Sequence, residues 1–382
     1  MKVGIVCYAS LGGSGVVATE LARALAARSH EVHLMSSEEP FRWRSGVPGL
    51  SFERVETPTY PLFREPQYLL ALANTIVRVS REHRLDIVHA HYAVPHATAA
   101  YLADQILAAE GGPAPPRMVT TLHGTDITLV GSAPSYARVV RFSIEQSHAV
   151  TAVSRSLRET TLTALAVARD IRVIPNFLDC ATYRRRPAPA LAERLRRRGP
   201  AGVIAHASNF RPVKRVDAVV EIFRRVRERT AAALLLIGDG PDRERAGQRI
   251  QELGLEDAVE FAGEQHDLVP WLSASDVFLL PSAEESFGLA ALEAMACQVA
   301  VVASRVGGLP EVVEDGTTGY LYAAADLEGM AGRIVSLLED DALRGRIGSA
   351  AAARVETAFC AERIVPLYER CYEDVLAGRT TV

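Results

Sequence analysis

Long apolar runs, closely spaced cysteines and an excess of one charge are all missing from this sequence. No apolar stretch approaches the roughly 18 residues that a membrane-spanning helix needs. The cysteines are odd in number and include no C-x-x-C pair, so we expect neither a disulfide framework nor a zinc knuckle. This cysteine usage is typical of a protein in a reducing compartment. They are Cys7, Cys180, Cys297, Cys360 and Cys371.

The charge balance excludes further classes of protein. Lys and Arg number 42 and Asp and Glu 46, which gives a net charge of −4. A general nucleic-acid binder or a protein held on an anionic membrane would be more basic. The opening MKVGIVCYAS predicts a strand rather than a signal peptide, because its apolar core is too short. We therefore expect a soluble cytoplasmic protein without stable membrane association. The sequence leaves its oligomeric state open, a homo-oligomer included.

Apolar runs alternate with amphipathic stretches through the first half of the chain. The runs predict strands, and 16–28 predicts a helix. Since the runs are apolar on both faces and helices separate them, we expect a parallel sheet covered on both sides. The predicted strands are 2–8, 31–36, 86–92, 117–124, 148–154 and 171–176.

The alternation stops at the arginine-rich stretch 183–200 and then begins again. We expect an N-terminal Rossmann-like α/β domain over 1–180, a linker over 183–200 and a second such domain over 201–360. A last helix at about 361–377 would cross back to the first domain. Such a pair of domains predicts a ligand cleft between them, at the carboxyl ends of their strands. The second set of predicted strands is 201–208, 231–240, 258–264, 277–282 and 299–304.

A glycine-rich loop joins the first predicted strand to the first helix. Gly13, Gly15 and Ala18 match the G-x-G-x-x-A pattern of dinucleotide-binding turns, and Glu38 closes the second strand region. An NAD oxidoreductase is therefore one hypothesis. In physical terms, the loop predicts only that backbone amides at a helix N-terminus can approach an anion.

The segment 282–321 is the most informative in the chain. Glu285 and Glu293 lie eight positions apart around a predicted helix start, and eight helical steps span about 12 Å. At that distance they cannot share one proton as a catalytic pair. They can instead hold two parts of one hydroxyl-rich ligand, because carboxylates accept hydrogen bonds from sugar hydroxyls.

These motifs together resemble the retaining GT-B glycosyltransferases of family 4. The resemblance extends along the whole chain and includes the Glu285-x7-Glu293 pair, GGLPE at 307–311, LHGTD at 122–126 and GDGP at 238–241. The resemblance is strongest to members that transfer N-acetylglucosamine from UDP-N-acetylglucosamine to the hydroxyl of L-malate. The segments that carry it are CYASLGGSGVVATELA, DIVHAHYAVPHA and HASNFRPVKRV. That reaction is the first step of bacillithiol biosynthesis. The resemblance thus implies a GT-B fold, these two small-molecule substrates and no cofactor.

The resemblance also implies which residues hold the donor. Glu293 would bind the ribose hydroxyls, Glu285 the donor sugar and Lys214 the diphosphate, with backbone amides near Gly13, Gly288 and Leu289. Many family members carry an arginine where this chain has Asn209. We expect the second diphosphate contact from either Asn209 or Arg211, and the sequence does not decide between them.

A catalytic metal is not expected, because these cations would neutralise the leaving diphosphate. The sequence has no Asp-x-Asp motif for Mg²⁺. His89, His91 and His96 form the cluster most suggestive of zinc, but no cysteine is nearby, and we interpret them as strand-end histidines whose hydrogen bonds are satisfied.

The N-terminal half would bind the acceptor. By resemblance, His123 contacts the donor sugar near the reacting carbon, and Asp126 orients its loop. Malate carries two carboxylates, which predicts at least one arginine able to bind in a bidentate manner. We expect that residue to be Arg141, with hydroxyl and amide partners from Ser14, Tyr92 and Asn176.

Other functions remain open at this stage. Another family 4 enzyme would glycosylate a lipid or a polysaccharide, although no exposed basic amphipathic segment supports this. A nucleotide-sugar epimerase shares the GT-B architecture, and a non-catalytic sensor would bind the donor without releasing UDP. The NAD oxidoreductase leaves the Glu285-x7-Glu293 pair unexplained.

Overall fold

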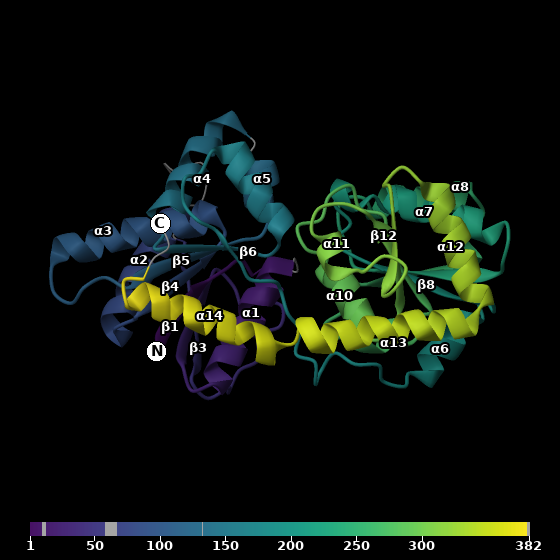
Figure 1. The fold of residues 1–382 in the computed structure, drawn as a ribbon, viewed down its shortest axis with the longest axis horizontal. Coiled ribbons are helices and arrows are strands. Elements are labelled where there is room, and N and C mark those ends of the chain that lie inside the picture. Colours follow the sequence, from purple (N-terminus) through teal and green to yellow (C-terminus); the bar gives the residue numbers. More distant parts are fainter. Residues whose placement is uncertain (10–12, 58–66, 132, 380–382) are drawn as a thin grey trace. The chain divides into compact units, whose positions relative to one another are not determined.

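The computed structural model describes residues 1–9, 13–57, 67–131 and 133–379, which form two units (Figure 1). Unit 1 consists of Met1–Asn176 and Ala361–Val382, and unit 2 consists of Phe177–Cys360. Within these described ranges, no helix is both long and apolar enough to cross a bilayer.

Unit 1 is built on a seven-stranded sheet in the order β3-β2-β1-β4-β5-β6-β7, and all of its strand pairs are parallel. The central strands β1 and β4 are almost entirely buried, as expected of a sheet with both faces covered. The chain reverses direction across the sheet between β1 and β4, where parallel α/β sheets bind ligands. The bounds are β1 (Lys2–Val6), β2 (Glu31–Ser36), β3 (Leu50–Arg54), β4 (Ile87–His91), β5 (Arg117–Leu122), β6 (Ala149–Ala152) and β7 (Arg172–Val173).

Two sets of helices cover this sheet. Helices α2 and α3 pack on Val6, Met35 and Val88, whereas α14 lies beside α1 and contacts β5 (Figure 1). Helix α14 buries Tyr372, whose hydroxyl bonds to Nδ1 of His89 at 2.8 Å. The last helix is therefore part of the core of unit 1. The helices are α1 (Gly13–Ala27), α2 (Tyr68–His83), α3 (Thr98–Glu110), α4 (Pro134–Gln146), α5 (Arg155–Leu165) and α14 (Ala361–Leu376), with π-helical turns at Ala93–Ala97 and Asp126–Val130.

Unit 2 has a six-stranded parallel sheet in the order β10-β9-β8-β11-β12-β13. Its core includes Ile204 and Leu234 from the sheet, Phe223 from α7 and Ile334 from α12. The strands are β8 (Gly202–Ala207), β9 (Ala232–Ile237), β10 (Val259–Gly263), β11 (Val277–Leu280), β12 (Ala300–Ser304) and β13 (Gly319–Tyr322). The helices are α6 (Pro189–Arg196), α7 (Val216–Arg227), α8 (Arg243–Glu252), α9 (Val269–Ser273), α10 (Leu289–Ala296), α11 (Leu309–Val312), α12 (Leu327–Glu339) and α13 (Asp341–Ala358), with 3₁₀ turns at Pro212–Lys214 and Glu256–Ala258.

The stretch 183–200, expected to be a linker, lies inside unit 2 and contains α6. Leu195 of α6 is fully buried, and the helix packs beside β8 and β9. Arg196 donates to the carboxylate of Asp276 at 3.0 Å. The arginine-rich composition of this stretch thus reflects the exposed side of a docked helix.

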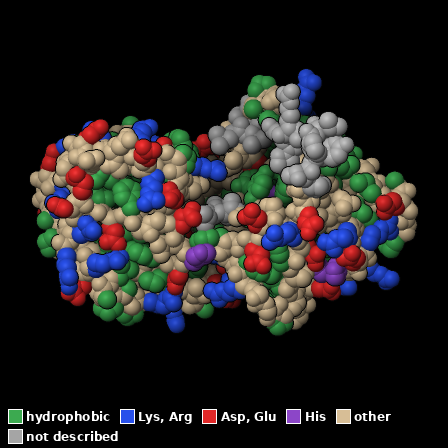
Figure 2. Space-filling model, turned by 180° about the vertical axis from the view of Figure 1, so that it is seen from behind, with side chains coloured by type: hydrophobic (Ala, Val, Ile, Leu, Met, Phe, Trp, Pro, Cys, Tyr) green, Lys and Arg blue, Asp and Glu red, His purple; other side chains and the backbone are tan. Residues whose placement is uncertain are grey.

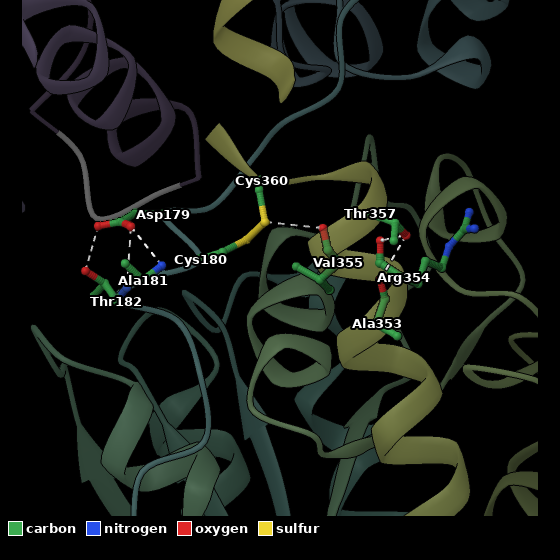
Figure 3. The surroundings of a disulfide bond; sticks show 9 residues. All are labelled: Asp179, Cys180, Ala181, Thr182, Ala353, Arg354, Val355, Thr357 and Cys360. Carbon is green, nitrogen blue, oxygen red and sulfur yellow. Dashed lines mark hydrogen bonds between the residues drawn. A yellow bond between two sulfur atoms is a disulfide. The ribbon is translucent and has the colours of Figure 1, made fainter. Parts of the chain in front are cut away.

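A disulfide joins Cys180 to Cys360, so our expectation of no disulfide is wrong for this pair (Figure 3). The two cysteines are 180 positions apart in the sequence, so no spacing pattern reveals them. Folding brings them together because Leu178 donates its backbone N–H to Phe359 at 3.0 Å, which aligns the first and last segments of unit 2. Beside the bridge, Asp179 accepts from the Thr182 hydroxyl at 2.6 Å.

The surface charge agrees with the near-neutral composition. On the face drawn in Figure 2, acidic and basic side chains are interspersed and no broad region carries a single sign. Polyanionic ligands must therefore meet local cations on this face.

Candidate functional site

Two loops of unit 2 bring Lys214 and Glu285 together. Lys214 ends the 3₁₀ turn after β8, and Glu285 lies in the turn after β11. Lys214 Nζ donates to Glu285 Oε1 at 2.6 Å, and the hydroxyl of Ser282 donates to the same oxygen at 2.9 Å. A backbone hydrogen bond of 2.8 Å from Ala283 to Val213 joins the loops. The arrangement holds a cation and a carboxylate side by side at the carboxyl edge of the sheet.

The Gly307-Gly308 pair explains how the Glu285 turn is held. Gly308 donates its N–H to the carbonyl oxygen of Glu285 at 2.8 Å. Gly307 has a φ of +53°, and a Cβ there would collide with that same carbonyl oxygen. A Cβ at Gly308 would likewise collide with the carbonyl oxygen of Ser286. Both glycines are therefore required for the close approach of the two loops.

Helix α10 begins later than the sequence suggests. Gly288, with a φ of +100°, precedes the first helical residue Leu289, so Glu285 lies in the preceding turn rather than on the helix. The eight-step helical rise of about 12 Å consequently does not apply to Glu285 and Glu293. Both carboxylates are buried, with 9% and 3% of their surfaces exposed. A buried carboxylate needs polar partners, and for Glu285 these are Lys214 and Ser282.

The two alternatives for a second diphosphate contact differ in their surroundings. Asn209 follows β8, and its Oδ1 is buried without a hydrogen-bond partner among the described residues. Gly240 packs so closely that a Cβ there would collide with the Asn209 carbonyl oxygen. Arg211 is exposed. Asn209 therefore has an acceptor to satisfy, whereas Arg211 offers a solvated positive charge.

In unit 1, Ser14 and Tyr92 meet where the sheet reverses. Ser14 is in the first turn of α1 and Tyr92 follows β4; the Tyr92 hydroxyl donates to Ser14 Oγ at 2.8 Å. Tyr92 has a φ of +97°, which is rare for a bulky residue and suggests a functional constraint. Gly13 is exposed at the start of α1, and Gly12 lies outside the described residues.

His123 follows β5 and is neutral at physiological pH. Its Nε2 lies 2.9 Å from Nδ1 of His91, and burial lowers the pKa of His123 to about 3. Asp126 accepts backbone N–H bonds from Gly124 at 2.9 Å and from Ala93 at 3.1 Å, while burial raises its pKa to about 6. Asp126 thus ties the loop after β5 to the turn after β4. His123 can take part in hydrogen bonds, but it does not carry a positive charge at physiological pH.

Each strand-end histidine has a partner, but Nε2 of His91 and Nε2 of His96 are buried without one among the described residues, so our expectation of satisfied hydrogen bonds holds only for His89. His89 uses both ring nitrogens, Nδ1 to Tyr372 and Nε2 to the hydroxyl of Thr121 at 2.7 Å. His96 Nδ1 bonds to the His91 carbonyl. Across the described ranges, His89, His91 and His96 do not form a group with converging metal-ligand atoms.

The remaining two acceptor residues lie in different settings. Asn176 is the last residue of the first segment of unit 1, and its Oδ1 is buried without a partner in the described part of the chain. Arg141 lies on α4 with 47% of its side chain exposed, and its Nε donates to Glu145 at 2.9 Å. The described contact of Arg141 is therefore a surface ion pair.

Two contact residues were not among those we expected. Ser282 orients Glu285, and His91 bonds to His123. Both follow or end a strand in sequence, but position alone does not identify the side chain that they contact.

Two family models match the chain, one for each half. The model described as Glycosyltransferase Family 4 matches residues 11–182, and the model Glycosyl transferases group 1 matches residues 189–354. The curated N-acetyl-alpha-D-glucosaminyl L-malate synthase of Bacillus anthracis is 44% identical over 376 residues, which is 98% of this chain and 97% of that protein. D-inositol 3-phosphate glycosyltransferase of Frankia alni is 28% identical over 90% of both chains.

Solved structures share the fold at lower identity. Sucrose-phosphate synthase from Thermosynechococcus elongatus superposes with a TM-score of 0.81 at 23% identity and covers 99% of both chains. HepE of Anabaena, in complex with UDP and glucose, has a TM-score of 0.78 at 22% identity, over 98% of this chain and 99% of that one. Both similarities extend over the two units.

Proposed function

Because this chain belongs to family 4 of the glycosyltransferases and has their GT-B fold, we propose that it transfers N-acetylglucosamine from UDP-N-acetylglucosamine to L-malate. The observation that carries the proposal is the 44% identity to the Bacillus anthracis synthase along nearly the full length of both chains. Configuration at the sugar would be retained, and the product would enter bacillithiol biosynthesis. We include a cytoplasmic location, since donor and acceptor are small water-soluble molecules. In that compartment the Cys180–Cys360 bridge would have to resist reduction, because disulfides are rare in the cytosol.

Unit 2 would hold the donor. In a nucleotide sugar the diphosphate is bonded directly to C1 of the sugar, and Lys214 and Glu285 are likewise immediate neighbours. Lys214 would contact the diphosphate and Glu285 the sugar hydroxyls, with the N–H of Leu289 at the start of α10 as a further donor. Glu293 would bind the two ribose hydroxyls.

The same geometry supports a reaction without a metal ion. Oε1 of Glu285 accepts hydrogen bonds from both Lys214 and Ser282. This oxygen is therefore engaged with a lysine and a hydroxyl rather than available as a ligand for a metal ion. Lys214 would stabilise the negative charge that develops on the leaving diphosphate, helped by Asn209 or Arg211.

Unit 1 would hold the acceptor. Ser14 and Tyr92 offer hydroxyl groups, and Asn176 an amide whose Oδ1 lacks a partner in the described part of the chain. Arg141 would bind a malate carboxylate after exchanging its ion pair with Glu145. That pair is exposed, so its loss costs little, about 1 kcal/mol or less.

The chemical step would occur on one face of the sugar. The malate hydroxyl oxygen forms a bond to C1 while the bond from C1 to the diphosphate oxygen breaks, and that oxygen takes the hydroxyl proton. UDP and the glycosylated malate are the products. His123, neutral through burial, would form a hydrogen bond with the sugar near C1 without adding charge.

The decisive experiment measures UDP released from UDP-N-acetylglucosamine with and without L-malate, together with the mass of the product. We expect release to depend on malate and the product to combine both substrates. D-inositol 3-phosphate and glycerol serve as control acceptors, tested in place of malate. Malate-independent release of UDP would favour an epimerase, and donor binding without any release would favour a sensor.

A further inference from the structure

Three potential metal ligands converge in unit 1 near the amino end of β2. Glu31 and His33 lie two positions apart on one face of this strand, and His83 is the last residue of α2. Glu31 Oε1 is 3.1 Å from His33 Nε2 and 3.6 Å from His83 Nδ1. All three ligand atoms lie within 4.8 Å of one another.

These separations match those of ligands around a tetrahedral ion. Zinc binds imidazole nitrogen and carboxylate oxygen at about 2.0–2.2 Å, so two ligand atoms at the tetrahedral angle lie roughly 3.4 Å apart. The observed 3.1 and 3.6 Å fall on either side of that value. The two imidazole rings are close as well, with centroids 3.9 Å apart.

Surrounding groups hold each ligand by its other atom. Nδ1 of His33 bonds to the hydroxyl of Ser51 at 2.8 Å and lies 3.8 Å from Glu53, which leaves Nε2 directed at Glu31. The second oxygen of Glu31 lies 3.4 Å from Lys2 Nζ. Zinc-binding histidines commonly engage a hydroxyl or carboxylate through their second nitrogen in this way.

An ordinary hydrogen bond between Glu31 and His33 does not account for His83. A hydrogen-bonded pair needs no third group, yet His83 directs Nδ1 at the same carboxylate oxygen while its Nε2 lies 4.0 Å from Glu82. Together the three side chains form a set of two histidines and one carboxylate. Zinc binds such sets of three protein ligands with a water molecule in the fourth coordination position.

We propose that Glu31, His33 and His83 form a binding site for Zn²⁺, with the fourth position left to water. Two imidazoles favour a transition metal over Mg²⁺ or Ca²⁺, which prefer oxygen ligands. His33 is nearly buried and anchors the site, whereas Glu31 and His83 are 42% and 34% exposed and allow an ion to enter. The ion would link the end of α2 to β2 and stabilise unit 1 by mass action.

This site is separate from the residues proposed for glycosyl transfer. Glu31 is the first residue of β2, at the amino edge of the sheet, whereas Tyr92 and His123 follow the carboxyl ends of β4 and β5. The inference therefore does not depend on the proposed function, and the loss of the zinc site should leave UDP release unchanged.

The test is a Zn²⁺ titration of the full chain after chelator treatment and dialysis, read by competition with a chromophoric chelator. We expect one equivalent of Zn²⁺ to bind and to raise the melting temperature, and excess Mg²⁺ not to compete. His83→Asn should weaken binding by at least roughly tenfold. His266→Asn, which alters an exposed histidine of unit 2, is the matched control and should bind as the wild type does.

X-ray absorption at the zinc edge identifies the ligands independently of stability. The proposal requires nitrogen and oxygen ligands with an imidazole signal and no sulfur. Glu31→Gln provides a second variant that should weaken binding if His83→Asn folds poorly. The inference is overturned if the wild type binds no stoichiometric Zn²⁺, if sulfur ligands appear, or if a folded His83→Asn retains wild-type affinity.

Discussion

Lys214 and Glu285 share a hydrogen bond of 2.6 Å although 71 positions separate them in the sequence. The pair joins the loops after two neighbouring strands, β8 and β11, at the edge where parallel sheets bind ligands. It gives the proposed donor site one positive and one negative group at fixed positions. Both groups can therefore be tested separately.

Replacing Lys214 by methionine should depress turnover strongly with little change in the fold. Methionine keeps most of the side-chain volume but removes the charge that stabilises the leaving diphosphate, an effect that grows in the transition state. Steady-state UDP release measures this. Arg211→Met is a second test: a comparable loss would assign it the second diphosphate contact, and unchanged turnover would favour Asn209. Wild-type turnover in Lys214→Met would contradict the charge assignment.

Glu293→Gln should weaken UDP binding by about 1.5–3 kcal/mol, because a neutral amide replaces a charged acceptor for two ribose hydroxyls. Isothermal titration calorimetry with UDP gives the value directly. Unchanged affinity would remove Glu293 from the nucleotide site.

Glu285→Ala should spare UDP binding and lower turnover instead. Of the donor, Glu285 would contact only the transferred N-acetylglucosamine, which UDP lacks. Its removal leaves Lys214 with its charge for the diphosphate. The same calorimetry and a turnover assay separate the two roles. Equal losses of UDP affinity in both glutamate variants would show that our division of roles is wrong.

Activity should survive an excess of EDTA, since Lys214 would take the place of a metal ion at the diphosphate. UDP release before and after chelation, followed by addition of Mg²⁺ or Mn²⁺, tests this. Loss of activity with rescue by either ion would overturn the proposed mechanism. A fall in melting temperature alone would instead point to the zinc site of unit 1.

Arg141→Lys should raise the KM for L-malate and hardly change that for the donor. A planar guanidinium binds a carboxylate through two parallel hydrogen bonds, and lysine supplies only a point charge. We expect about a tenfold loss in kcat/KM for malate, or about 1.4 kcal/mol. Arg138→Lys, at another exposed position of α4, should behave as the wild type does. Intact malate kinetics in Arg141→Lys would refute the acceptor assignment and leave the glycosyltransferase assignment standing.

Reduction of the Cys180–Cys360 bridge should lower the stability of unit 2. A crosslink across 180 positions lowers the conformational entropy of the unfolded chain, which raises the free energy of unfolding by up to about 5 kcal/mol in the loop-entropy model. Denaturant unfolding with and without a reductant measures the effect. The Cys180→Ser/Cys360→Ser double variant should be insensitive to reductant, and equal stabilities for oxidised and reduced wild type would show that the bridge has no stabilising effect.

The central strands of both sheets could be predicted from sequence because each is a buried apolar run between helices. Two edge strands could not. β3 reads LSFER and is only partly buried, and β13 is four residues long with alternating burial. The other two edge strands, β7 and β10, lie within the predicted stretches 171–176 and 258–264, so position at an edge is not by itself the reason. Strands β3 and β13 extend the predicted sheets without altering their parallel order.

The candidate site was predicted less evenly than the fold. Motif resemblance predicted roles for Lys214 and Glu285, which the structure brings into hydrogen-bond contact. The start of α10 depends on the positive φ of Gly288, which a helical pattern does not reveal. Arg141 was chosen from chemistry alone, and its partner Glu145 is four positions away on the same helix. Cys180 and Cys360 required the tertiary fold, since no local spacing relates them.

The position of α14 has a consequence for synthesis on the ribosome. Domains generally fold in chain order as they emerge, but unit 1 takes its last helix from residues 361–376. Unit 2 can complete its core once Cys360 has emerged. At that stage His89 still lacks its hydrogen bond to the Tyr372 hydroxyl in unit 1. The unit that is translated first is thus the one that is finished last, and a nascent chain stalled before Ala361 would expose the surface that α14 covers.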